Sequence, residues 1–175
     1  MLEHLTRMAR YNAWANTRLY DAVAALPGER WKEDTGLFFR SIHGTLNHLL
    51  AADLIWMARF EGQSEIVGLD APTRLDAVCF DELQPMREAR ERLDAHMIDF
   101  VKSHDEASIH REISFTPITD PTPVTQVLSP TLAHVFNHQT HHRGQCHAGL
   151  TRLVGDAPPM DLVYYLREER LGKAA

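Results

Sequence analysis

Four long stretches with apolar residues at helical spacing constrain the fold of this chain most. They cover about residues 2–26, 41–60, 81–102 and 129–153, and the spacing predicts a helix over each of them. Pro27-Gly28, Gly62 and Gly155 follow three of the stretches as stop signals. Ser129-Pro130 opens the fourth, where serine is expected as the N-cap and proline as the first helical residue. Four such helices predict an all-α four-helix bundle.

The segments between the helices predict little further regular structure. Residues 106–128 hold β-favouring side chains around Asp120-Pro121-Thr122-Pro123, which indicates a small hairpin or extended excursion before the fourth helix. A short final helix is expected over residues 161–167. Because no linker, repeat or low-complexity tract interrupts the 175 residues, we expect residues 1–175 to form a single domain.

Composition excludes several classes of protein. The formal net charge is −6, with acidic and basic residues interspersed and no basic block, so we expect no nucleic-acid partner. Cys79 and Cys146 are the two cysteines, and no Cys-x-x-Cys pair occurs, which disfavours a thiolate metal cage or a disulfide framework. The chain has no signal-like start and no apolar run of about 18 residues. A cytoplasmic protein with no membrane partner is therefore expected.

The fourth predicted helix carries a polar ribbon that points to a metal. At 100° per residue, its members fall near one line: Thr131, His134, His138, His142, Gln145 and Gly149. A solvated helix face would be the ordinary explanation, but residues 129–155 contain no Asp, Glu or Lys, which such a face normally recruits. Imidazoles at positions i and i+4 can reach one ion. The spacing predicts His138 and His142 as ligands, with His134 one turn back beside them.

The second predicted helix leaves its polar residues open to two interpretations. His48 projects about 140° from the centre of the strongest apolar stripe, which suggests a peripheral position. However, the helix is apolar almost all round, as expected of one buried on two sides, and this would leave room for a metal beside His48. Asp53 lies inside the apolar stripe, where a carboxylate needs a partner such as an arginine or a histidine N–H. Its role is either structural or in support of the ligands.

Three motifs together resemble the DinB family of damage-inducible-type, YfiT-like proteins. They are Tyr11-Asn-Ala-Trp-Ala-Asn16, Gly44-Thr-Leu-Asn-His-Leu-Leu-Ala-Ala-Asp53 followed by Trp56, and Asn137-His-Gln-Thr-His-His-Arg-Gly-Gln145. The resemblance extends over nearly the whole chain. It implies an up-down-down-up four-helix bundle, commonly a homodimer, in which His48, His138 and His142 hold a divalent metal. Nickel or zinc is the metal implied first, with iron or manganese as alternatives.

The same resemblance implies an activity. Relatives of this architecture are thought to act as metal-dependent thiol S-transferases or isomerases. A low-molecular-weight thiol, bound as thiolate, would be directed at a small electrophile. We expect the pocket to be lined by Trp56, the loop after the second helix and Tyr164-Tyr165, with Asp53, His134 and Gln145 as supporting residues. The alternatives are a non-catalytic metal-binding stress-response protein and a metal-dependent hydrolase.

Overall fold

Helices dominate the computed structural model, which describes residues 1–173. The four long helices and the short α5 are α1 (Leu2–Ala24), α2 (Ile42–Glu61), α3 (Leu83–Lys102), α4 (Leu128–Val154) and α5 (Leu162–Arg170). Two 3-10 helices, η1 (Arg30–Lys32) and η2 (Ser108–His110), lie in the connections. The prediction of a mainly helical protein is confirmed. Among the described residues, no helix combines the length and the apolar character that crossing a membrane requires.

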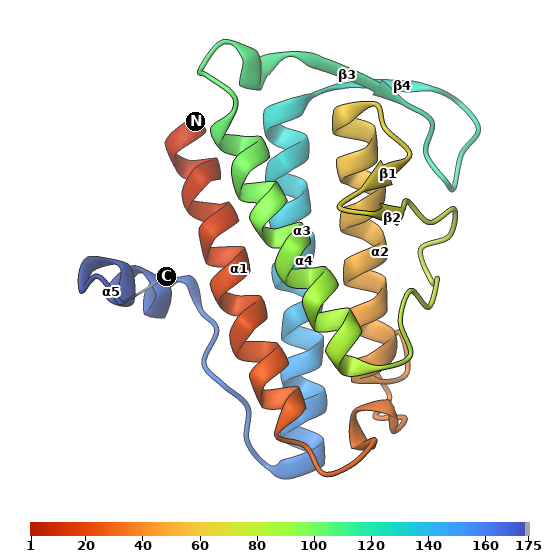
Figure 1. Cartoon of the computed structure of the whole chain (residues 1–175), viewed down its shortest axis with the longest axis vertical. Coiled ribbons are helices and arrows are strands. Elements are labelled where there is room, and N and C mark those ends of the chain that lie inside the picture. Colours follow the sequence, from red (N-terminus) through yellow and green to blue (C-terminus); the bar gives the residue numbers. More distant parts are fainter. Residues whose placement is uncertain (174–175) are drawn as a thin grey trace.

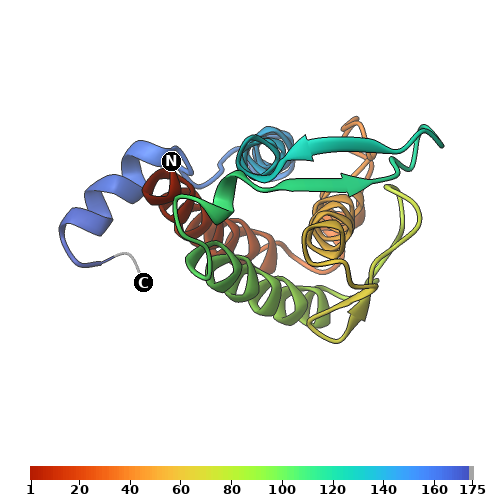
Figure 2. The same cartoon turned by 90° about the horizontal axis from the view of Figure 1, so that it is seen from above.

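The long helices lie side by side, and α5 lies outside them next to α1 (Figures 1 and 2). In the view of Figure 1, α1 and α4 run downward, whereas α2 and α3 run upward. The chain crosses over one end of the helices between α3 and α4. Helices α2 and α4, which carry the histidine motifs, are neighbours, so their facing sides can build one site.

That crossing segment contains the predicted hairpin. Strand β3 (Glu112–Phe115) pairs antiparallel with β4 (Val124–Val127), with Phe115 opposite Val124. The hairpin expected within residues 106–128 is confirmed, because alternating β-favouring residues flank a proline-rich turn. A second hairpin, which the sequence did not predict, joins β1 (Glu65–Ile66) to β2 (Leu69–Asp70). Its turn places Val67 at φ 51° and Gly68 at φ 80°, and valine at a positive φ is an uncommon turn residue that hides the signal.

The start of α2 follows local capping rules. Ser41 accepts a hydrogen bond from the Gly44 backbone N–H at 3.0 Å, and Gly62 ends the helix in the left-handed region at φ 68°. A side chain at position 44 would meet the Phe39 carbonyl oxygen at 2.2 Å from its Cβ. Glycine is therefore required for the close approach between the start of α2 and the preceding turn.

Several predicted helix boundaries are wrong by a few residues. The first helix ends at Ala24 rather than near residue 26, the third begins at Leu83 rather than 81, and α5 continues to Arg170. Ser129 is not the N-cap of α4, since the helix follows directly from β4 and already includes Leu128. The Ser129 hydroxyl instead bonds the Nδ1 of His110 at 2.9 Å.

A buried polar network ties α2, α3 and α4 together. Asp53 on α2 is fully buried and accepts hydrogen bonds from Arg90 on α3 at 2.7 Å and from Gln139 on α4 at 2.6 Å. Arg90 also pairs with Asp94 at 2.9 Å. The need of Asp53 for an arginine partner is thus met inside the core. Because Gln139 directly follows His138 in sequence, this network fixes the relative position of the two helices that carry the histidines.

Candidate metal centre

Three imidazoles converge between α2 and α4. Each of His48, His138 and His142 offers one nitrogen, and these nitrogens all lie within 4.8 Å of one another. The ring centroids are 4.5 Å apart for His138 and His142, 4.5 Å for His48 and His142, and 5.0 Å for His48 and His138. No other group of three or more metal-ligating side chains meets this criterion in residues 1–173. The helical spacing therefore brings His138 and His142 together as expected, and α2 supplies the third ring.

His48 lies on a buried side of α2, with 5% of its surface exposed. The peripheral position suggested by its angle from the apolar stripe is wrong, because α2 is covered on two sides: by the hydrophobic core and by the turn that carries Phe39. The Phe39 ring stacks on the His48 imidazole at a centroid distance of 4.0 Å. Phe39 had no signal in the sequence, since residues 28–40 form a loop with no regular period.

The distance between two of the nitrogens suits ligands of a single ion. The Nε2 atoms of His48 and His138 are 3.1 Å apart. Two nitrogens about 2.0–2.1 Å from a common ion stand roughly 2.8–3.4 Å apart, for right-angled to tetrahedral geometry. Without a cation, one of these two atoms would have to donate a proton to the other. With a cation, both lone pairs can point at it.

Hydrogen bonds fix the orientation of two of the rings. His48 Nδ1 lies 2.7 Å from the carbonyl oxygen of Leu75, and His142 Nδ1 lies 2.8 Å from Oε1 of Gln145. Both partners are acceptors, so each Nδ1 carries the proton and each Nε2 is left with its lone pair. Such partners hold metal-binding imidazoles in the correct tautomer. Gln145, which the sequence suggested as a supporting residue, therefore contacts His142, whereas the Leu75 carbonyl, being backbone, had no sequence signal.

The third ring is the least satisfied. His138 Nδ1 is buried and has no hydrogen-bond partner among the described residues. An ion held at Nε2 of this ring would leave Nδ1 without a partner, so this atom is no argument for a metal. The donor set of three neutral nitrogens, two of them oriented by acceptors, fits a borderline divalent cation.

The electrostatics of the cluster keep all three rings neutral at pH 7. Burial lowers the pKa of His138 to about 3, with smaller contributions from His142 and His48. Burial also lowers the pKa values of His48 and His142, against the raising effects of their hydrogen bonds to Leu75 and Gln145. Metal binding requires unprotonated imidazoles, so the site is prepared for a cation near neutral pH.

A cavity of about 390 Å³ opens beside two of the imidazoles. Its lining comes from α2, α4, the loop after α2 and the β3–β4 hairpin: His48, Ala52, Trp56, Arg59, Leu75, Phe115, Pro117, Ile118, Thr119, Val124, Gln126, His134 and His138. No aspartate or glutamate lines it. The hairpin wall was not predicted as part of a site, because only the crossing of the chain over the helices places it there.

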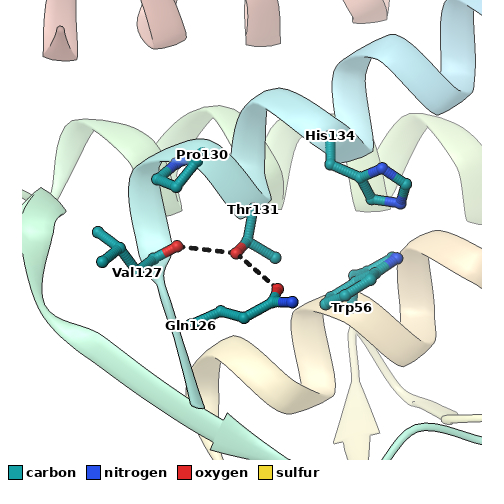
Figure 3. A pocket seen from close by; sticks show the side chains of 6 residues that line it. All are labelled: Trp56, Gln126, Val127, Pro130, Thr131 and His134. Atoms are coloured by element: carbon teal, nitrogen blue, oxygen red, sulfur yellow. Dashed lines mark hydrogen bonds between the residues drawn. The ribbon is translucent and has the colours of Figure 1, made fainter. Parts of the chain in front are cut away.

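A shallower hollow of about 490 Å³ continues from this cavity and shares Trp56, Gln126 and His134 with it. In Figure 3 the ring of His134 faces Trp56, and the two centroids are 5.6 Å apart. Thr131 donates to the Val127 carbonyl at 2.8 Å, which secures the start of α4 to the end of the hairpin. His134 and Trp56 therefore stand between the triad cavity and the outer hollow.

The other expected pocket residues separate into two groups. Trp56, His134 and the loop residue Leu75 line the cavity, and Gln145 contacts the triad. Asp53 does not reach the triad and acts within the core network. Tyr164 lies on α5, outside the four long helices (Figure 1), and does not line the cavity, so its expected place in the pocket is wrong. Its neighbour Tyr165 packs at a centroid distance of 6.0 Å from Tyr11 on α1.

The fold and site define a helical protein with a three-histidine cluster between two of its long helices. The family model described as the DinB family matches residues 1–172, and the chain belongs to this family. It is also similar to Protein DinB of Bacillus subtilis (strain 168), with 26% identity over 179 residues, covering 99% of this chain and all of that protein. The family resemblance carried by the three sequence motifs is thus confirmed.

Proposed function

We propose that this protein binds one divalent metal ion through the Nε2 atoms of His48, His138 and His142. The convergence of these three side chains within 4.8 Å is the observation that carries the proposal. The lowered pKa of His138, which keeps its ring neutral at pH 7, and the acceptors on the Nδ1 atoms of His48 and His142 support it. Zinc and nickel suit three imidazoles best, and iron and manganese are the alternatives.

Metal titration of protein purified without a histidine tag tests this directly. We expect one ion per chain by calorimetry and by elemental analysis. His138→Ala should abolish binding while leaving the far-UV circular dichroism unchanged, because this ring is only half-buried. His147→Ala is the matched control, since His147 lies on the same helix, outside the cluster. Stoichiometric binding by His138→Ala would contradict the proposal.

The finer proposal is metal-dependent S-transfer from a low-molecular-weight thiol to a small electrophile. An ion bound at the triad would supply Lewis acidity that lowers the pKa of a bound thiol. Three protein ligands leave an open position, as catalytic sites do, and the described residues offer no fourth ligand of the kind that closes structural sites. This favours catalysis over a non-catalytic role in stress response.

The cavity lining favours thiol chemistry over hydrolysis. A metal hydrolase commonly uses a carboxylate as general base beside the attacking water, and no aspartate or glutamate lines this cavity. Phe115, Ile118 and Val124 form apolar walls, and Trp56 and His134 line both this cavity and the outer hollow. These residues would hold and orient an apolar electrophile beside the triad.

Turnover assays separate the catalytic proposal from its rivals. Protein loaded with each candidate metal would be incubated with small thiols and a panel of electrophiles, with His138→Ala as control. Metal-dependent loss of free thiol that His138→Ala lacks supports S-transfer. Absence of turnover across the panel, together with a metal whose removal only lowers the melting temperature, would favour the non-catalytic role.

We also propose that the four long helices form the up-down-down-up bundle that is implied for this family. The opposite directions of α1 and α4 relative to α2 and α3 support this (Figure 1). The homodimer, the cytoplasmic location and a link to stress response stay predictions, and sedimentation equilibrium of untagged protein tests the first of them.

A further inference from the structure

One wall of the triad cavity contains a guanidinium without a carboxylate partner. Arg59 projects from α2 into the lining, and no acidic oxygen of residues 1–173 lies within ion-pair distance of it. Its one hydrogen bond, from Nη2 to the Thr116 carbonyl, is long at 3.5 Å. An arginine without a carboxylate partner keeps its charge and most of its donors available to a ligand beside the candidate site.

Aromatic rings position this guanidinium. The Cζ atom of Arg59 lies 4.6 Å from the Trp56 ring centroid and 4.6 Å from that of Phe115. Stacking engages the faces of the planar group, and its five N–H donors lie around its edge. The rings therefore hold Arg59 in place and leave most of its donors available to a molecule in the cavity.

The charge around the cavity is one-sided. Arg59 is the only arginine, lysine, aspartate or glutamate in the lining, which otherwise holds histidines, Thr119, Gln126 and apolar side chains. Burial lowers the pKa of Arg59, with no offsetting carboxylate. A divalent ion at the triad would add further positive charge within the same cavity. In a protein with a formal net charge of −6, this makes the cavity a local region of positive charge.

We propose that Arg59 binds the carboxylate of the thiol that occupies the triad cavity. This inference rests on the proposed thiol-dependent function and deepens it, because it assigns the substrate class: a thiol whose far end carries a carboxylate. A planar carboxylate matches the edge of one guanidinium. The one guanidinium in the lining balances the single charge of a carboxylate but only about half of the charge of a phosphate dianion.

The helix sets the reach of such a ligand. The guanidinium stacks on Trp56, which lies eight residues beyond His48 on α2, or about 12 Å along the axis at 1.5 Å per residue. Taken as the span from the triad to the guanidinium, this axial distance leaves roughly 7 Å between sulfur and carboxylate, after a metal–sulfur bond of ~2.3 Å and a hydrogen bond of ~2.9 Å. A six-carbon ω-mercapto acid spans this length, whereas mercaptoacetate does not.

Calorimetry on zinc-loaded protein tests the assignment with three probes: 6-mercaptohexanoate, its amide and mercaptoacetate. Arg59→Met keeps the apolar stem and removes the charge. Arg111→Met is the matched control, because Arg111 also joins the hairpin region to α2, through the Phe60 carbonyl, but does not line the cavity. Melting temperatures of both variants report any loss of hairpin anchoring.

We expect Arg59→Met to lower the affinity for 6-mercaptohexanoate about 10- to 100-fold, which is the range for loss of a hydrogen bond to a charged group. Binding of the amide and of mercaptoacetate should change less than about twofold, and Arg111→Met should bind all three probes as the parent does. If Arg59→Met lost the same affinity for 6-mercaptohexanoate as for its amide, the assignment would be overturned, and Arg59 would be a structural contact. If the zinc-loaded parent protein bound none of the three thiols, the thiol proposal itself would instead be overturned.

Discussion

Removal of Arg90 tests whether the buried network holds together the helices that carry the histidines. The side chains of Arg90, Asp53 and Asp94 are 3%, 0% and 6% exposed. Arg90→Met deletes the cation that separates two carboxylates. Leaving a buried charge without its partner costs about 3–5 kcal/mol, a large part of the roughly 5–15 kcal/mol that stabilises a domain.

The pH dependence of this loss has a definite sign. Burial already raises the pKa of Asp53, against the lowering effect of Arg90, and the variant should raise it further. A carboxyl whose pKa is higher in the folded state stabilises the fold below its unfolded pKa, and this contribution is lost as the pH rises through its folded pKa. The free energy of unfolding that Arg90→Met loses relative to the parent should therefore be smaller at pH 5 than at pH 7.5.

Urea unfolding followed by far-UV circular dichroism measures both effects. Arg87→Met is the matched control on the same helix, because Arg87 pairs with Asp21 and Glu91 at the surface, where ion pairs contribute about 0–1 kcal/mol. Adding Asp53→Asn to Arg90→Met should recover part of the loss. A loss of unfolding free energy below about 1 kcal/mol in Arg90→Met, or a loss that is larger at pH 5, would refute the explanation by an uncompensated buried charge.

Three further predictions concern the triad and its support. Gly44→Ala should lower the melting temperature and weaken zinc binding, because its Cβ would lie 2.2 Å from the Phe39 carbonyl oxygen and displace the ring that stacks on the triad; overpacking of this kind costs about 1–3 kcal/mol. Gln145→Leu should retain the fold but weaken zinc binding about 10- to 100-fold, since His142 loses its acceptor; calorimetry checks this, and unchanged affinity would contradict it. Burial lowers the pKa of His138 to about 3, whereas an unfolded histidine titrates near ~6.5, so metal-free protein should lose stability as the pH falls below ~6.5. Between pH 7.5 and pH 5, the urea concentration at the midpoint of unfolding should fall less for His138→Gln than for the parent.

The local sequence determined the helices and half of the site. Apolar spacing, the Ser41 cap and the glycines that follow α2 and α4 act within a few residues, so they can be recognised without knowledge of the fold. The same holds for His138 and His142, which share a face because a helix turns once in 3.6 residues. The absence of Asp, Glu and Lys from residues 129–155 already disfavoured a solvated face.

Tertiary structure decided the rest. His48 lies 90 residues before His138. Its angle from the apolar stripe of α2 could not show which segment covers it, and without the family motifs its role stayed open. The Leu75 carbonyl and the Phe39 ring reach His48 from irregular segments. The wall with Arg59 and Phe115 exists only because the β3–β4 hairpin crosses above α2. Periodicity is a property of one helix, whereas convergence of ligands depends on packing between segments far apart in the chain, which no local pattern records.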